Sequence, residues 1–289
     1  MKVLVTGGKG QLGYDVVNEL KRRGHDAIGV DIEEMDITDR KSVARVFAEV
    51  QPQAVVHCAA WTAVDAAEDE ENVSKVYAIN ADGTKYVAQE CKKLDCKMIY
   101  ISTDYVFDGR GTEPWAADCK DFMPLSVYGK TKLAGELAVA ELLEKFFIVR
   151  IAWVFGVNGK NFVKTMLNVA KTHDTVRVVN DQIGTPTYTF DLARLLVDMA
   201  ESDRYGYYHA TNEGGYISWY DFTKEIYRQA GLQTKVIPVS TAGYGLSKAL
   251  RPFNSRLDKS KLSDNGFQRL PVWQDALARY LKEIDHGTN

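Results

Sequence analysis

Short apolar runs alternate with amphipathic segments from the start of the chain to about Ala210. The runs are rich in β-branched residues and predict strands at Lys2–Val5, Ala27–Asp31, Ala54–Cys58, Lys97–Ser102, Phe147–Ala152 and Gly206–Ala210. The intervening segments repeat apolar residues at helical spacing and predict helices at Leu12–Arg23, Arg40–Val50, Asn72–Leu94, Ser126–Glu144 and Phe190–Glu201. This alternation, with strands that are apolar along their whole length, is typical of an α/β fold with a doubly wound parallel sheet.

After Gly156 the alternation loosens and the elements become less regular. Helices are expected at Asn161–Lys171, Ser218–Ala230 and Val272–Glu283, and strands at Val176–Val179 and Val236–Val239. We therefore predict two domains. The larger comprises residues 1–160 and 189–215, and a small mixed α/β domain comprises residues 161–188 and 216–289.

Composition and charge exclude several classes of protein. The chain has 289 residues, with 36 basic and 39 acidic side chains and a formal charge of −3. The sequence has no cluster of lysines and arginines of the kind that binds nucleic acid or an anionic membrane. No apolar run approaches the roughly 20 residues of a membrane-spanning helix. Met1 leads directly into a predicted strand, so we expect no signal peptide.

The four cysteines indicate neither disulfides nor a structural metal. They show no CxxC spacing and no histidine partners at metal-ligand spacing, and they are Cys58, Cys91, Cys96 and Cys119. We expect reduced thiols, no metal ligands and a cytoplasmic location.

A glycine-rich turn follows the first predicted strand and opens the first helix, as a dinucleotide site requires. Gly7 would permit the tight turn, Gly10 the approach of a diphosphate, and Gly13 close contact between helix and strand. The diphosphate would rest on the helix N-terminus at Gln11 and Leu12. The spacing is G-x-x-G-x-x-G instead of the commoner G-x-G-x-x-G, so this prediction depends on the strand and helix around it.

An acid at the end of the second strand bears on the choice of dinucleotide. Asp31 would accept hydrogen bonds from both adenosine ribose hydroxyls and repel a 2′-phosphate. Glu33 and Glu34 follow and no arginine adjoins, so we expect NADH to be preferred over NADPH, although Lys9 would weaken this preference. The alternative is that Asp31 merely ends a strand in a turn.

Four further residues are candidates for cofactor binding. Asp36 follows a possible short third strand and would meet the adenine amino group, or else cap the helix near Arg40. Ala59 and Ala60 end the strand that follows, where small side chains let a flat cofactor lie against the sheet edge. Thr62 completes this segment.

Tyr128 and Lys132 carry the predicted chemistry. On a helix, the side chains at positions i and i+4 lie on the same face, with their Cβ atoms about 5–6 Å apart. A cation beside a phenol lowers its pKa from near 10, which favours proton transfer to a developing alkoxide. Lys132 would also bind the nicotinamide ribose, and Thr103 would bring a hydroxyl to the same sheet edge. The pair predicts hydride transfer with Tyr128 as proton donor, although Tyr-x-x-x-Lys alone is common and Lys132 is alternatively a solvated helix residue.

Five motifs carry a resemblance to a known family. GGKGQLG, HCAAWTAVDAAE, STDYVFDG, YGKTKLAGE and RIAWVFG, in this order, resemble the extended short-chain dehydrogenase/reductases and, more narrowly, the dTDP-4-dehydrorhamnose reductases. The resemblance covers nearly the whole chain. It implies a Rossmann-type domain, a C-terminal sugar-nucleotide domain and a catalytic triad of Thr103, Tyr128 and Lys132. The implied reaction is NAD(P)H-dependent reduction of the C4 ketone of dTDP-4-dehydro-L-rhamnose to dTDP-L-rhamnose, a cell-surface polysaccharide precursor.

The resemblance also implies substrate-binding residues. They are Asp104, Tyr105, Trp153, Asn161, Phe162, Gln182, Thr187, Arg251 and Asn254. Trp153 would pack against the sugar, and the Arg251 guanidinium would donate two parallel hydrogen bonds to the diphosphate. The alternatives are core packing for Trp153 and loop capping for Thr187 and Asn254.

Related functions remain open at this stage. Sugar-nucleotide dehydratases carry a Thr-Asp-Glu run, and Tyr105 stands in place of that glutamate, which favours simple reduction. The remaining alternatives are an epimerase that retains its NAD and a non-catalytic regulatory subunit with the same fold. A homodimer is possible.

Overall fold

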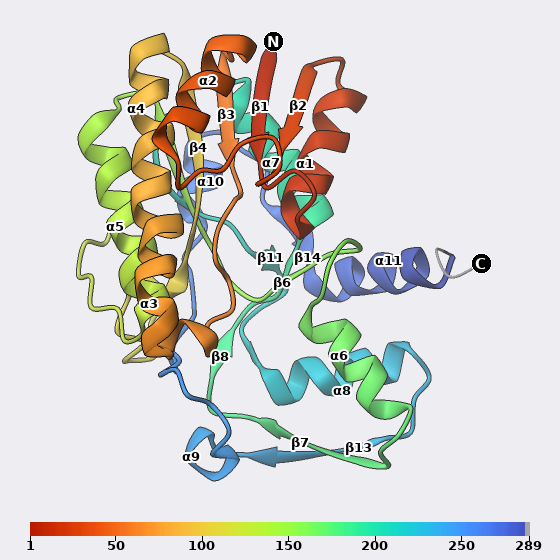
Figure 1. Ribbon diagram of the computed structural model, residues 1–289. Helices are drawn as coiled ribbons and strands as arrows, with labels where there is room; N and C mark the ends of the chain where they lie inside the picture. The colour runs from red at the N-terminus through yellow and green to blue at the C-terminus, as the bar shows by residue number, and fades with distance from the viewer. Residues whose placement is uncertain (287–289) are drawn as a thin grey trace.

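The computed structural model describes residues 1–286. At its centre lies a six-stranded, all-parallel sheet in the order β10-β5-β4-β3-β1-β2 (Figure 1). The strands are β1 (Lys2–Thr6), β2 (Asp26–Val30), β3 (Ala54–His57), β4 (Lys97–Thr103), β5 (Phe146–Ile151) and β10 (Gly206–His209). Strand order reverses between β1 and β3, so a ligand crevice is expected at the carboxyl ends of these strands.

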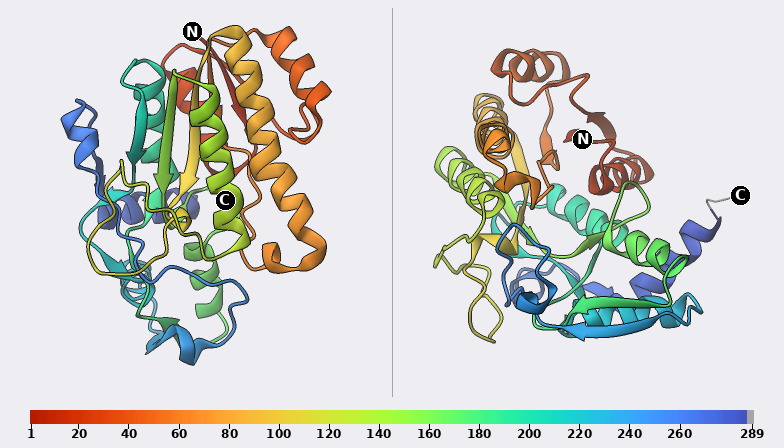
Figure 2. Two further views of the ribbon diagram at one scale, coloured as in Figure 1. Left: turned by 90° about the vertical axis from the view of Figure 1, so that its left-hand side faces the viewer. Right: turned by 60° about the horizontal axis from the view of Figure 1, so that its bottom comes forward.

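Helices cover both faces of this sheet, which confirms the predicted doubly wound Rossmann-type fold (Figure 2). One face carries α1 (Gln11–Arg22) and α7 (Thr189–Ala200), and the other carries α2 (Arg40–Val50), α4 (Thr84–Leu94) and α5 (Val127–Leu142). Successive strand residues point to opposite cores: Val3 and Val5 pack under α1, and Leu4 packs on the opposite face.

Two sequence expectations about this sheet region need correction. No strand precedes α2, since residues 31–39 form turns, so Ala54–His57 is the third strand and not the fourth. The helix expected at Asn72–Leu94 is α3 (Glu70–Tyr77), a π-helical stretch at Ala78–Gly83 and then α4. π-helical stretches often occur at functional sites.

A third core lies beyond the carboxyl edge of the sheet. It is built from α6 (Phe162–Ala170), β7 (Thr175–Val179), α8 (Trp219–Gln229), β13 (Lys235–Val239) and α11 (Trp273–His286). These elements confirm the helices and strands expected here. Most of this core comes from the two ranges that we assigned to the small domain, and the domain boundaries stay a prediction.

Short strand pairs and turns join the two parts. The pairs are β6 (Val154–Phe155) with β9 (Thr187–Tyr188), β8 (Ile183–Gly184) with β12 (Ile217–Ser218), and β11 (Asn212–Glu213) with β14 (Leu270–Val272). The short helices are η1 (Ala66–Glu68), η3 (Asp104–Val106), α9 (Thr241–Tyr244) and α10 (Ser260–Asp264). Across residues 1–286, no helix has the length and apolar character needed to cross a membrane.

Candidate active site

Three adjoining cavities follow the carboxyl edge of the sheet. The central cavity, of about 590 Å³, lies between the end of β4, the start of α5 and the start of α1. It shares Gly10, Cys58 and Ala60 with a cavity of about 430 Å³ at the ends of β1 and β2, the glycine-turn cavity. It shares Tyr105 with a cavity of about 380 Å³ beside α6 and α8, the helix-side cavity. The central cavity therefore adjoins both of the others along this edge.

The glycine-rich turn has the geometry that a diphosphate requires. Gly7 has a φ of +66°, and a Cβ there would lie 2.9 Å from the backbone nitrogen of Ala59. A Cβ at Gly13 would overlap the Gly7 carbonyl oxygen. No side chain caps the N-terminus of α1, so its first amide groups remain for an anion. Because Gly10 and Gln11 line the central cavity, the turn fits a dinucleotide.

Asp31 lines the glycine-turn cavity at the end of β2. Its carboxylate accepts a hydrogen bond from the backbone N–H of Lys9 at 2.6 Å, which joins it to the glycine-rich turn. The Lys9 ammonium is directed to Glu33 and Glu34, at 3.1 and 3.3 Å. Asp31 is therefore more than a strand terminus, and acids surround the nearest lysine.

The other cofactor candidates lie around the same two cavities. Asp36 and Ala59 line the glycine-turn cavity, Ala60 lines both, and Leu12 and Thr62 line the central cavity. The alternative that Asp36 caps the next helix is wrong, because Asp39 caps α2 by accepting from the N–H of Lys41. Asp36 accepts instead from Thr38.

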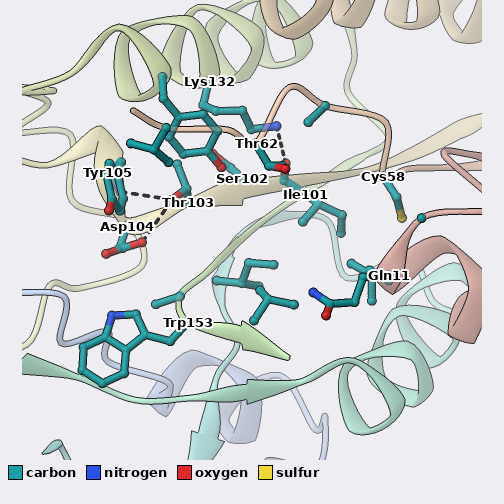
Figure 3. Close-up of a pocket in the computed structure, with 18 of the residues that line it drawn as sticks. Gln11, Cys58, Thr62, Ile101, Ser102, Thr103, Asp104, Tyr105, Lys132 and Trp153 are labelled. Carbon is teal, nitrogen blue, oxygen red and sulfur yellow. Dashed lines mark hydrogen bonds between the residues drawn. The ribbon is translucent and has the colours of Figure 1, made fainter. Parts of the chain in front are cut away.

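Tyr128 and Lys132 lie in the first turns of α5, facing the end of β4. Ser126 caps this helix by accepting from the N–H of Gly129, where any Cβ would collide with the Tyr105 carbonyl oxygen. The helix therefore sits close against the segment that follows β4. Figure 3 shows Lys132 reaching across to the strand end that carries Thr103.

The ammonium of Lys132 is buried and held by the sheet. Its Nζ donates a hydrogen bond to the Ile101 carbonyl at 2.7 Å and lies 4.1 Å from the centroid of the Tyr100 ring. Burial lowers the pKa of Lys132 to about 7, against the opposing charge of the Glu136 carboxylate. The alternative of a solvated helix residue is therefore wrong for Lys132.

The pKa of Tyr128 differs from the sequence expectation. Burial raises the pKa of the Tyr128 phenol, and the Thr103 hydroxyl beside it only partly opposes this. The expected lowering by Lys132 is wrong for the protein without a cofactor, because spacing on a helix does not determine where the ammonium points. A phenol with a raised pKa keeps its proton at neutral pH, so without a cofactor Tyr128 holds a proton but is a weaker acid than we expected.

A buried carboxylate adjoins this pair. Thr103 Oγ donates to Asp104 at 3.0 Å, and Ser255 Oγ donates to the other carboxylate oxygen (Figure 3 shows the first of these bonds). Burial raises the pKa of Asp104 to about 6, although both hydroxyls favour the ionised form. Asp104 therefore links the end of β4 to the segment that contains Ser255.

This raised pKa predicts an effect on stability. The folded protein holds the Asp104 proton more tightly than the unfolded chain, so stability is lost as pH rises through about 6. The difference in free energy of unfolding between Asp104→Asn and wild type should therefore be about 2 kcal/mol more favourable to the variant at pH 8 than at pH 4. Urea unfolding at the two pH values measures this difference, with the exposed Asp82→Asn as control. Equal differences at both pH values would contradict the assignment.

Four of the predicted substrate residues line the helix-side cavity: Tyr105, Phe162, Gln182 and Arg251. Tyr105 packs edge-to-face on Tyr128, with ring centroids 5.5 Å apart. The Arg251 guanidinium donates two hydrogen bonds to Asp65, at 3.0 and 2.7 Å. The cavity thus combines aromatic walls with an oriented guanidinium.

Trp153 forms the boundary between two cavities. It lines the central cavity and stacks at 3.7 Å on Trp219, which lines the helix-side cavity. Its φ of +52° is unfavourable for a bulky residue and is often found at functional sites. The stacking partner and the backbone conformation together hold the indole in place.

The other three predicted substrate residues line none of these cavities. Asn161 caps α6 and donates to Gln11, the Thr187 hydroxyl donates to the Ala152 carbonyl, and Asn254 donates to carbonyls of the 110–113 segment. The side chains of all three hydrogen-bond other parts of the protein, which agrees with the capping alternative for Thr187 and Asn254.

Comparisons with known proteins agree with this geometry. The family model described as RmlD substrate binding domain matches residues 1–286. The spore coat polysaccharide biosynthesis protein SpsK of Bacillus subtilis is 42% identical over 282 residues, covering 98% of this chain and 97% of that protein. The chain belongs to the RmlD substrate binding domain family.

Solved structures also resemble this RmlD-family chain over nearly its whole length. A dTDP-4-dehydrorhamnose reductase from Clostridium acetobutylicum has a TM-score of 0.94 at 42% identity, covering 99% of this chain and 100% of that chain. Another from Bacillus anthracis, in complex with NADP, has a TM-score of 0.93 at 40% identity, covering 98% and 100%. The resemblance is thereby confirmed, and the protein is an NAD(P)-dependent oxidoreductase.

Sequence reasoning missed several residues of this RmlD-family site. Ser102 lines the central cavity, and its buried hydroxyl has no hydrogen-bond partner within residues 1–286. Its signal was its place beside Thr103 at a strand end. Ser255 bonds to Asp104 and Asp65 bonds to Arg251, in each case a residue far away in the chain, and no local pattern reveals such contacts. Within residues 1–286, all four cysteines are free and no cluster of acids, histidines and cysteines could hold a metal ion.

Proposed function

We propose that this protein reduces the C4 ketone of dTDP-4-dehydro-L-rhamnose to dTDP-L-rhamnose with NADH or NADPH. The observation that supports this most directly is the meeting of Thr103, Tyr128 and Lys132 in one cavity, with the glycine turn on one side and Arg251 on the other. The relatives named dTDP-4-dehydrorhamnose reductase support the choice of sugar nucleotide.

The glycine turn and its neighbours would hold the cofactor. The diphosphate would lie on the amides at the start of α1, the adenosine between Asp31 and Asp36, and the nicotinamide against Ala60 and Thr62. When bound, the cofactor supplies the hydride that adds to C4.

The proton is supplied by the protein itself. The Tyr128 phenol and the Thr103 hydroxyl would both hydrogen-bond the ketone oxygen, and Tyr128 would donate its proton there as negative charge develops. Lys132 would contribute positive charge at the same place and bind the nicotinamide ribose. Burial keeps Tyr128 protonated at neutral pH, so this role needs no prior deprotonation.

The sugar nucleotide would enter from the helix-side cavity. Arg251 would bind its diphosphate, since the Asp65 carboxylate holds the guanidinium in a fixed orientation. Trp153 would pack against the sugar, and Phe162 and Gln182 would contact the nucleoside. Tyr105 stands between the two halves of this path and contacts both cavities.

Asp31 should set the cofactor preference, with NADH favoured over NADPH. Replacing Asp31 by alanine removes a charge that repels a 2′-phosphate and leaves Lys9 nearby. We expect the ratio of kcat/KM for NADH to that for NADPH to fall about tenfold. Steady-state kinetics with both cofactors measure this, and Asp26→Ala, at the other end of β2, is the control. An unchanged ratio would show that Asp31 does not contact the ribose.

A substrate panel tests the proposed function. Consumption of NADH and NADPH is followed with thymidine- and uridine-linked 4-keto sugars, and we expect the highest kcat/KM with dTDP-4-dehydro-L-rhamnose. An epimerase would instead keep its NAD through purification. The absence of any NADH or NADPH consumption, together with a stoichiometric partner in a pull-down, would support a regulatory subunit. The homodimer and the cytoplasmic location stay predictions.

A further inference from the structure

A loop crosses the glycine-rich turn and is tied to it by side chains. It comprises residues 156–161 between β6 and α6, and we call it the strap (Figures 1 and 2 show it beside the start of α1). Asn158 Nδ2 donates to the backbone carbonyls of Lys9 at 2.6 Å and Gly10 at 3.4 Å. Asn161 Nδ2 donates to Gln11 Oε1 at 2.9 Å. The strap therefore contacts three consecutive residues at the place where a diphosphate is expected.

The strap is also braced by a side chain of α6. Lys164 Nζ donates to the backbone carbonyls of Val157 and Gly159, the latter at 2.9 Å. Gly159 has a φ of +76°, which lets the chain turn back at the end of the strap. The next residue, Lys160, lines the central cavity together with Gly10. Lys160 is thus presented to the cavity by a turn with a defined shape.

Lys160 differs from the other lysines near the cofactor site. The Lys9 ammonium is paired with two glutamates, and the Lys132 ammonium is buried against the Ile101 carbonyl. Within residues 1–286, no acid or hydrogen-bond acceptor is paired with the Lys160 ammonium. The uncapped amides of α1 line the same cavity, so two sources of positive charge face one space.

We propose that Lys160 binds the diphosphate of the nicotinamide cofactor and clamps it against the N-terminus of α1. The inference rests on the proposed function only in taking the cofactor to be a nicotinamide dinucleotide. The amides bind the phosphate oxygens from one side, and the ammonium adds a point charge from the strap. Arg251, in the helix-side cavity, serves the diphosphate of the sugar nucleotide, so the two diphosphates have separate cations.

Direct binding to the purified protein tests the clamp without any sugar nucleotide. We expect Lys160→Ala to raise the Kd of NADH about tenfold at low ionic strength, and about 1 M salt should reduce this difference. Lys160→Arg should stay within about threefold of wild type. The affinity for ADP-ribose, which has the diphosphate but no nicotinamide, should fall by the same factor, whereas the affinity for adenosine, which has no phosphate, should not change.

Two further variants separate the charge from the strap. Asn158→Ala releases the strap without removing the charge and should raise the Kd of NADH about threefold. Lys85→Ala, an exposed lysine on α4, should leave it unchanged. An unaltered Kd of NADH in Lys160→Ala would overturn the proposal, as would a rise confined to the KM of the sugar nucleotide. Because binding is measured without substrate, a wrong sugar assignment would leave these outcomes interpretable.

Discussion

Replacing Tyr128 by phenylalanine should lower kcat about 10³-fold, the middle of the range for loss of a general acid. The ring and its packing against Tyr105 remain, so the KM of the sugar nucleotide and the Kd of NADH should stay within about twofold. We expect the loss in kcat because the phenol gives its proton to the ketone oxygen only as that oxygen becomes negative, and phenylalanine has no proton to give. Initial rates with saturating NADH and fluorescence titration of NADH measure these quantities.

The matched control for this experiment is Tyr77→Phe, which removes an exposed phenolic hydroxyl on α3. It should retain the kcat of wild type. If Tyr128→Phe also kept a wild-type kcat, the proton would come from another group, and Asp104 would be the next residue to examine.

The second large effect concerns Lys132 and pH. Its pKa of about 7 means that the ammonium loses its charge as pH rises through 7, so kcat/KM for NADH should decline above that pH. Lys132→Met removes the charge at all pH values. It should lower kcat/KM at least about 100-fold at pH 6 and abolish this decline. A pH profile from 5.5 to about 9 measures both effects.

Lys130→Met serves as the control, because Lys130 is an exposed lysine on the same helix. It should retain both the rate and the decline above pH 7. If the Lys132→Met enzyme still showed the decline, a group other than Lys132 would cause it. That group would not be Tyr128, because burial raises the pKa of this phenol well above the pH range of the profile.

Much of the fold was predictable because its signals are local. All four residues of β3 are buried and the first three are apolar, so the strand is visible in the sequence, and α2 has the predicted bounds. The π-helical stretch was not predictable. It contains buried Asn80, whose side-chain amide hydrogen-bonds the backbone of Trp61 and the hydroxyl of Thr131, contacts that no periodic pattern shows.

The candidate site was predictable in its residues but not in its electrostatics. The spacing of Tyr128 and Lys132 correctly placed both in one cavity. The hydrogen bond from Lys132 to the Ile101 carbonyl joins residues 31 positions apart, and this partner, not the phenol, holds the ammonium. The hydrogen bonds of Thr187 and Asn254 were not predictable for the same reason, because their carbonyl partners lie far away in the chain, and their role in substrate binding stays a prediction.

Isotope transfer tests the central claim most directly. dTDP-4-dehydro-L-rhamnose is incubated with NADH that carries deuterium at the transferable position, and the product is examined by NMR. We predict dTDP-L-rhamnose with one deuterium at C4 for each NADH consumed. A product without deuterium at C4, or NADH consumption without this product, would contradict the account.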